Sequence, residues 1–102
     1  MATPESKAKS RLYRLLKKYN CYYTMAVTGG YGRSGAADVS GCSDGRYFGV
    51  EVKADTKVTA LQQKNLDDIV SAGGRAFVVR KKSDGTEYGY DELELFLKEG
   101  LL

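Results

Sequence analysis

The pentapeptide Gly49-Val50-Glu51-Val52-Lys53 has the alternating pattern of a β-strand with one apolar face and one charged face. Side chains alternate along a strand, so Val50 and Val52 should point to one side of the sheet and Glu51 and Lys53 to the other. At about 3.3 Å per residue, the two charged residues lie roughly 7 Å apart along the chain. We therefore predict a strand that buries two valines and places a carboxylate beside an ammonium group.

A second strand-like run, residues 37–41, precedes this one and contains Asp38. Residues 43–46 (Ser-Asp-Gly-Arg) lie between the two runs, and Asp-Gly before an apolar run is a strong hairpin signal. A hairpin would place Asp38 level with Glu51. Two carboxylates and the Lys53 ammonium at one end of a hairpin suit a magnesium site for phosphodiester chemistry. The alternative is an ordinary strand face on which Glu51 and Lys53 form a solvated pair.

The composition limits the chemistry that this chain can perform. Its 102 residues suffice for one domain with one modest core, which we expect to span residues 1–102. The sequence contains no histidine, which excludes Ser-His-Asp and Cys-His catalysis and HExxH zinc sites. Catalysis would therefore need carboxylates, lysines, hydroxyl groups and a hard metal ion. The formal net charge of +3 permits a nucleic-acid partner without requiring one.

The sequence has no apolar run long enough to cross a membrane and no signal-peptide pattern at its N-terminus. Cys21 and Cys42 lack the spacing of a metal or redox motif, and we expect both to be reduced and buried. These features predict a cytoplasmic protein with no membrane partner.

The N-terminal segment has the pattern of an amphipathic helix that begins at Thr3-Pro4-Glu5, with threonine as N-cap and proline at the first helical position. Glu5 lies on the apolar side, where it either interacts with the helix dipole or reaches a functional site. The apolar side consists of Ala8, Leu12, Leu15, Leu16 and Tyr19. A second stripe is either a solvated face or a phosphate-contacting surface, and its members are Lys7, Arg11, Arg14 and Lys18.

Residues 21–28 are rich in aromatic and β-branched side chains and predict a strand. The loop that follows contains a literal GxGxxG motif at residues 30–35. A dinucleotide-binding fingerprint requires a helix after the motif, and residues 36–41 are too short to form one, so we expect no nucleotide cofactor. The loop either flanks Asp38 and offers Arg33 and backbone amides to a phosphate, or is a plain connection.

A capping-box pattern at residues 59–62 (Thr-Ala-Leu-Gln) predicts a second helix, which extends to about residue 72 and ends at Gly73-Gly74. Gln62 has two interpretations. It either caps the helix through the Thr59 amide or reaches from the helix start into a functional site, and the residues alone favour the cap. The predicted buried face consists of Leu66, Ile69 and Val70.

The C-terminal part should complete the sheet. Residues 75–80 form a nearly all-apolar run typical of an interior strand, which the preceding helix can place parallel to the Glu51 strand. A short strand at residues 86–90 and a helix at residues 91–100 follow, the helix ending at Gly100 with Leu93, Phe96 and Leu97 inward. The predicted fold is α/β (α+β): an αβββαβ core with a mixed central sheet flanked by helices, plus a β-α tail.

This order and four motifs resemble the PD-(D/E)xK nuclease superfamily, and within it the small stand-alone, phage-type VRR-Nuc domains. The motifs are residues 35–38 (Gly-Ala-Ala-Asp), 45–53 (Gly-Arg-Tyr-Phe-Gly-Val-Glu-Val-Lys), 59–62 (Thr-Ala-Leu-Gln) and 72–74 (Ala-Gly-Gly). The resemblance covers residues 5–97 and implies a restriction-endonuclease-like fold. One departure is Ala37, which stands where the family often has proline, a position that shapes the turn and is not a ligand.

The resemblance implies a metal-dependent site. Asp38, Glu51 and the backbone carbonyl of Val52 would bind Mg²⁺ (or Mn²⁺), which polarises the scissile phosphate and lowers the pKa of a bound water. Lys53 would orient that water and stabilise charge developing on the phosphate. A divalent cation would also remove the repulsion between the Asp38 and Glu51 carboxylates.

Two helix residues gain roles from the same resemblance. Gln62 matches the family's helix-start glutamine, which favours a site role over plain capping. Glu5 matches the glutamate of the N-terminal helix, which would contribute to the metal site directly or through water.

The resemblance further implies a DNA endonuclease similar to Holliday-junction resolvases, acting as a homodimer whose two sites make paired cuts. A phage-encoded protein would act in the host cytoplasm. Recognition would depend on DNA backbone and shape. The alternatives are a nickase, a flap-cutting or general degradative nuclease, and a non-catalytic DNA-binding module. The candidate DNA-contacting residues are Lys7, Arg11, Arg14, Lys18, Arg33 and Lys57.

Overall fold

The secondary-structure elements follow the predicted order. The computed structural model describes residues 3–26 and 36–99. No helix within these ranges is long and apolar enough to span a membrane. The elements are α1 (Pro4–Lys18), β1 (Tyr22–Met25), β2 (Val39–Ser43), β3 (Arg46–Lys53), α2 (Ala60–Ser71), β4 (Arg75–Lys81), β5 (Glu87–Tyr88) and α3 (Tyr90–Glu99).

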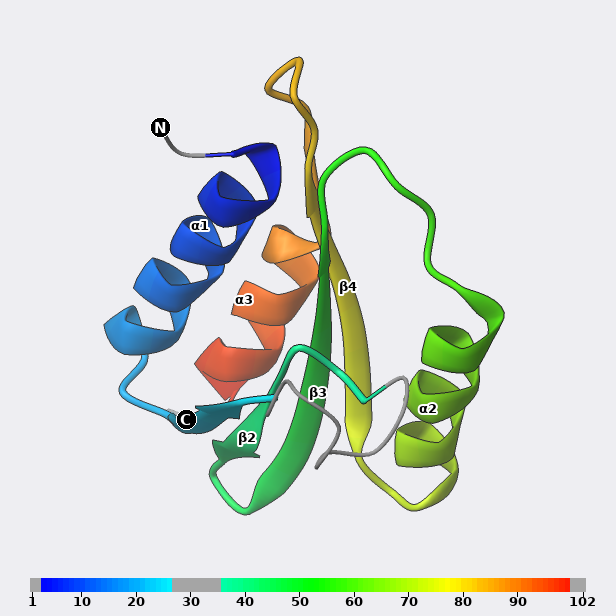
Figure 1. Cartoon of the computed structure of the whole chain (residues 1–102). Coiled ribbons are helices and arrows are strands. Elements are labelled where there is room, and N and C mark those ends of the chain that lie inside the picture. The colour runs from blue at the N-terminus through cyan, green and yellow to red at the C-terminus, as the bar shows by residue number, and fades with distance from the viewer. Residues whose placement is uncertain (1–2, 27–35, 100–102) are drawn as a thin grey trace.

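The five strands form one mixed sheet in the order β1-β2-β3-β4-β5. Neighbouring strands are antiparallel except β3 and β4, which are parallel. Helix α2 makes the crossover connection that this parallel pair requires. Figure 1 shows α1 and α3 side by side on one face of the sheet and α2 on the other. The prediction of a mixed sheet flanked by helices is confirmed.

The main core lies between the sheet and the α1–α3 pair. Val50 and Val52 of β3 are buried in it, as their alternation predicts. The Tyr90 hydroxyl donates a 2.9 Å hydrogen bond to the Ala8 carbonyl and so joins α3 to α1 beneath the sheet. The other core side chains are Leu12, Leu15, Leu16, Val39, Phe48, Phe77, Val79, Leu93, Phe96 and Leu97.

Two local signals act as the sequence predicts. In the β2–β3 turn, Asp44 has φ 52° and Gly45 has φ 78°. Positive φ at both central residues matches the right-handed twist of a tight hairpin. At the start of α1, the Thr3 hydroxyl accepts a 3.1 Å hydrogen bond from the Ser6 amide, and Pro4 occupies the first helical position. The turn sets the register of the two strands that carry the predicted site.

Helix α2 is rotated relative to the predicted orientation. Leu66 is buried and Ile69 is half-buried, but Val70 is 57% exposed, so its predicted burial is wrong. Asn65 is buried instead. The face toward the sheet follows i, i+3, i+4, i+7 from Gln62, and Val70 lies about 100° away from Ile69 around the helix. The contact of Gln62 with β3, described below, explains this rotation.

Two further predictions need correction. Helix α3 begins at Tyr90, before the predicted start at residue 91, because the Leu93 amide donates to the Gly89 carbonyl (3.2 Å) and closes an earlier turn. Both cysteines are free thiols, but Cys42 is exposed and Cys21 is only half-buried. Cys42 alternates with the core-facing residues of β2, which explains its exposure. Residues 27–28 of the predicted strand, the GxGxxG loop and Gly100 lie outside the described residues.

Candidate active site

The hairpin holds Asp38 at the end of β3 that carries the charged pair. The register of β2 against β3 places Asp38 opposite Glu51. Asp38 Oδ2 accepts a 2.8 Å hydrogen bond from the Val52 amide. The Asp38 carbonyl accepts another, also 2.8 Å, from the Ala26 amide just beyond β1. Asp38 is therefore fixed from both sides, its backbone by the β1 side and its carboxylate by β3.

Glu51 is a deeply buried carboxyl group, with only 2% of its surface exposed. Its Oε1 accepts a 3.0 Å hydrogen bond from Gln62 Nε2. Lys53 Nζ lies 3.9 Å from the same oxygen, and the lysine side chain is 13% exposed. Glu51 Oε2 is buried and has no hydrogen-bond partner among the described residues. Buried polar atoms are normally paired, so this oxygen requires either a proton shared with Asp38 or a bound cation.

Gln62 combines the two roles that the sequence presents as alternatives. Its backbone amide donates to Thr59 Oγ1 at 3.1 Å, and its Oε1 accepts from the Thr59 amide at 2.9 Å, which completes the capping box. Its Nε2 remains available and donates to Glu51. An amide side chain has both a donor and an acceptor end, so capping and site contact occur together.

The surroundings of Glu51 raise the pKa of its carboxyl group from 4.5 to about 8. Burial is the largest cause, because it disfavours the charged form. The Asp38 carboxylate raises the pKa further by its charge and by favouring a shared proton. The Lys53 ammonium opposes these effects, and Glu5 adds a smaller increase. Without a cation, Glu51 is therefore mostly protonated at neutral pH.

The donor atoms at this site fit a hard divalent cation. Asp38 and Glu51 supply carboxylate oxygens, one of which is the unpartnered Oε2. Oxygen ligands, with several positions left to water and substrate, are what Mg²⁺ prefers. Within residues 3–26 and 36–99, no group of three or more His, Cys, Asp or Glu side chains is arranged to hold a metal. The protein's side-chain ligands would thus be two carboxylates, and the Val52 carbonyl stays a predicted third ligand.

Glu5 does not lie on the buried side of α1, and this prediction is wrong. Its side chain is 60% exposed and lies 3.7 Å from Lys9 Nζ. A carboxylate without a buried partner is more stable in water, which explains its exposure. Its charge still contributes to the raised pKa of Glu51. Its role at the metal, directly or through water, remains a prediction.

The predicted cationic contacts are divided between paired and exposed side chains. Arg11 lies 3.6 Å from Glu87, and Lys18 lies 3.1 Å from Glu94. Helix α1 covers the face of the sheet opposite to α2 (Figure 1). The Glu51 side chain faces α2, because it bonds Gln62 of that helix. The others are Lys7 and Arg14, exposed on α1, Lys57, exposed in the β3–α2 connection, and Arg33, which lies outside the described residues.

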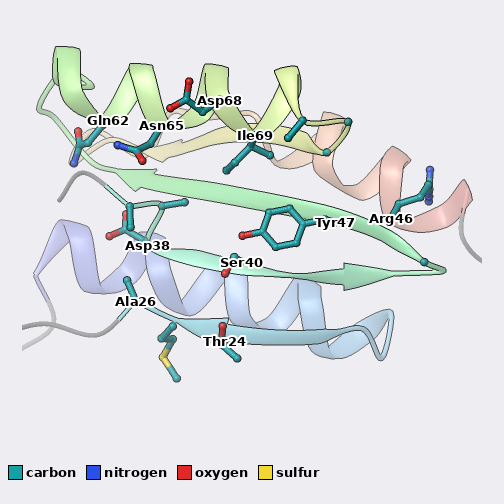
Figure 2. A pocket seen from close by; sticks show the side chains of 17 residues that line it. Thr24, Ala26, Asp38, Ser40, Arg46, Tyr47, Gln62, Asn65, Asp68 and Ile69 are labelled. Carbon is teal, nitrogen blue, oxygen red and sulfur yellow. The ribbon is translucent and has the colours of Figure 1, made fainter. Parts of the chain in front are cut away.

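A groove of about 870 Å³ runs between α2 and the β1–β2 side of the sheet. Asp38 and Gln62 line one end of it, and Tyr47 lies in its middle between α2 and β2 (Figure 2). Sequence reasoning missed Tyr47, although strand alternation from Glu51 places it on the same face of β3. The groove continues directly from the candidate site.

Sequence reasoning also missed Arg80. Its Nη1 donates to the Ala54 carbonyl at 3.0 Å and to the Thr56 carbonyl at 2.6 Å, just after Lys53. Arg80 pairs with Lys53 across the parallel β3–β4 ladder. No motif in the sequence points to this contact, because it depends on the register of two strands separated by a helix.

The fold is shared with a known nuclease. No protein-family model matches the sequence, and no curated protein matches it. Among solved structures, the chain is similar to Hjc of Archaeoglobus fulgidus, a Holliday junction resolvase from an archaeal hyperthermophile. The superposition has a TM-score of 0.60 at 16% sequence identity and covers 84% of this chain and 77% of that chain. The predicted restriction-endonuclease-like fold is confirmed.

Proposed function

We propose that this protein is a metal-dependent endodeoxyribonuclease that hydrolyses phosphodiester bonds in branched DNA, in the manner of a Holliday-junction resolvase. The observation that carries this proposal is the buried Glu51 carboxyl group, whose Oε1 lies 3.9 Å from Lys53 Nζ and whose Oε2 accepts no hydrogen bond from a described residue. The resolvase-like fold supports it. We place the chain with the phage-type VRR-Nuc domains of the PD-(D/E)xK superfamily, acting in the host cytoplasm.

The proposed cation is Mg²⁺ or Mn²⁺, held by Asp38, Glu51 and the Val52 carbonyl. A divalent cation, when bound, supplies polarisation of the scissile phosphate and a water of lowered pKa. Asp38 keeps its carboxylate aimed at the site through the hydrogen bond from the Val52 amide. Gln62 holds Glu51 Oε1, which leaves Oε2 as the free ligand atom.

Lys53 is the proposed electrostatic catalyst. Its ammonium group lies 3.9 Å from Glu51 on a mostly buried side chain. A preorganised cation in a site of low dielectric stabilises the negative charge that develops on the phosphate. Lys53 would also orient the attacking water.

A chain of this size has little surface with which to hold branched DNA alone, which supports a two-fold homodimer. Two sites related by a two-fold axis would make the paired cuts that a four-way junction requires. The proposed phosphate contacts are Lys7, Arg11, Arg14, Lys18, Arg33 and Lys57.

The test is cleavage of a matched DNA panel in Mg²⁺, comprising a four-way junction, splayed arm, flap, duplex and single strand. Wild-type protein should cut the junction with symmetric paired nicks, and Asp38→Asn should bind it without cutting. Equal cutting of all substrates would support phosphodiester hydrolysis but would indicate a general nuclease in place of a resolvase. Binding without cutting in both Mg²⁺ and Mn²⁺ would overturn the enzymatic proposal.

A further inference from the structure

We propose that the groove beside α2 binds an unpaired nucleobase of the DNA strand being cut, stacked on the ring of Tyr47. This inference rests on the proposed nuclease function and names a class of substrate for it: DNA with unstacked nucleotides next to the scissile phosphate. The groove has a volume of about 870 Å³ and is continuous with the candidate site through Asp38 and Gln62.

The position of Tyr47 suits a base next to the reacting phosphate. Tyr47 and Glu51 lie on the same face of β3, roughly 13 Å apart at about 3.3 Å per residue. A stacked strand advances about 3.4 Å per nucleotide, so Tyr47 is within a few nucleotides of a phosphate at Glu51. Figure 2 shows the Tyr47 hydroxyl directed along the groove toward Asp38, with Ile69 on one side and Ser40 on the other.

The Tyr47 ring is packed along one edge by the described residues. Half of the residue surface is exposed. A Cβ added at Gly74 would lie 3.1 Å from Tyr47 Cδ1 and 2.8 Å from Ile69 Cγ2, so the missing side chain gives the ring its space against the α2–β4 turn. A ring that is packed along one edge presents a preorganised stacking surface at small entropic cost.

The charges of the groove favour a base over a phosphate. The charged residues among its described lining are Asp38, Asp68 and Arg46. The Arg46 guanidinium lies 4.2 Å from the centre of the Phe96 ring and donates to the Phe96 carbonyl and to Glu99. Its hydrogen bonds are therefore made to α3 and not to a ligand in the groove. Phosphate binding depends on lysine and arginine, whereas stacking needs only an aromatic face.

Polar groups along the groove can recognise the edge of a base. Thr24 and Ser40 offer hydroxyl groups, which can donate to or accept from the polar edge of a base. A paired and stacked base cannot present its face to Tyr47, but an unpaired one can. The groove therefore selects DNA in which a nucleotide has left the stack, as at a branch point.

The experiment measures binding without cleavage. Fluorescein-labelled duplex DNA and the same duplex with a short unpaired segment at its centre are titrated in EDTA by anisotropy. Wild-type protein should bind the unpaired form more tightly. Tyr47→Ala should lose about fivefold or more in affinity for that form, since one stacked base contributes at least this factor. Its affinity for plain duplex should stay the same, and Tyr47→Phe should keep the preference.

Tyr88→Ala is the matched control, because Tyr88 is 53% exposed and lies on β5, outside the groove. The inference is overturned if wild type shows no preference, if Tyr47→Ala weakens both DNAs equally, or if Tyr88→Ala has the same effect. It is also overturned if Tyr47→Ala converts a dimer to a monomer in sedimentation, which would assign the groove to a second copy. Cleavage by wild type in Mg²⁺ is read separately, so the nuclease proposal can survive each of these outcomes.

Discussion

Gln62 Nε2 donates a 3.0 Å hydrogen bond to Glu51 Oε1, so the first turn of α2 is tied directly to the buried carboxyl group of β3. The same side chain accepts from the Thr59 amide through its Oε1. A helix cap therefore doubles as the support of the candidate metal ligand. This contact leads to the first of five predictions.

Gln62→Ala should destabilise the protein and impair cleavage together. The change removes the Gln62 donor from the buried Glu51 Oε1, and leaving a buried polar group unpaired costs about 1–3 kcal/mol. It also removes the acceptor of the exposed Thr59 amide, which water can replace. Loss of a residue that orients a metal ligand costs about 10–100-fold in activity. Urea unfolding and junction cleavage measure the two effects. Gln63→Ala is the control, because its side chain bonds the exposed Asp67 and not Glu51, and equal losses in the two variants would contradict the role of Gln62.

The metal-free protein should lose stability as the pH rises from about 5 to about 8. The unfolded Glu51 carboxyl group loses its proton near pH 4.5, but the folded one keeps it to about pH 8. Between these values the folded state binds more protons, so the free energy of unfolding falls as the pH rises, by an amount on the order of a few kcal/mol. Urea unfolding in EDTA at several pH values measures this slope. Glu51→Gln should flatten it, and an unchanged slope in that variant would assign the effect to other groups.

Mg²⁺ should raise the midpoint of thermal unfolding, and EDTA should reverse the change. A ligand that binds only the folded state stabilises it by about 2.7 kcal/mol at a hundred times its dissociation constant. Asp38→Asn and Glu51→Gln should each abolish the shift. Glu92→Gln, at an exposed position of α3, should retain it. A full shift in Asp38→Asn would remove Asp38 from the ligand set.

Lys53→Ala should lose cleavage but keep metal binding. Removal of one preorganised group that stabilises the transition state costs about 100–1,000-fold in rate. The Mg²⁺-induced change in unfolding midpoint should persist, because Asp38 and Glu51 remain. Single-turnover cleavage of the junction measures the loss. Lys64→Ala, which removes an exposed lysine paired with Asp68 on α2, should cut at the wild-type rate.

The salt dependence of DNA binding should separate exposed cations from paired ones. Each phosphate contact contributes about 0.9 to the slope of log affinity against log salt. Lys57→Ala should lower the slope by about this amount. Lys18→Ala should change it less, because Lys18 already lies 3.1 Å from Glu94. Lys98→Ala, on α3 and outside the proposed set of contacts, is the control, and a larger effect there than at Lys57 would move the DNA surface away from the β3–α2 connection.

The parts of the site that the sequence predicts depend on local signals. The Asp44-Gly45 turn fixes the hairpin register, and the register in turn places Asp38 opposite Glu51. The alternation of β3 then puts Glu51 and Lys53 on one face. Each of these steps spans only a few residues, so the sequence pattern alone is sufficient to predict where the three side chains lie.

The parts that the sequence does not predict depend on how elements meet. The apolar side chain of Val70 predicts burial on α2, but with Gln62 directed at Glu51 the helix buries Asn65 and exposes Val70. Arg80 reaches the loop after Lys53 only because β3 and β4 are parallel in this register. No short sequence pattern indicates how a helix is rotated about its axis, or which residues of two parallel strands pair across a crossover helix.

The hydrogen bonds to the two candidate carboxylates join residues within one continuous stretch of chain. Asp38 and Val52 are 14 residues apart, and Glu51 and Gln62 are 11 apart. Contacts between residues close in sequence form quickly, because little chain must be ordered to make them. We therefore expect these contacts to form early in folding, before α3 packs against the opposite face of the sheet.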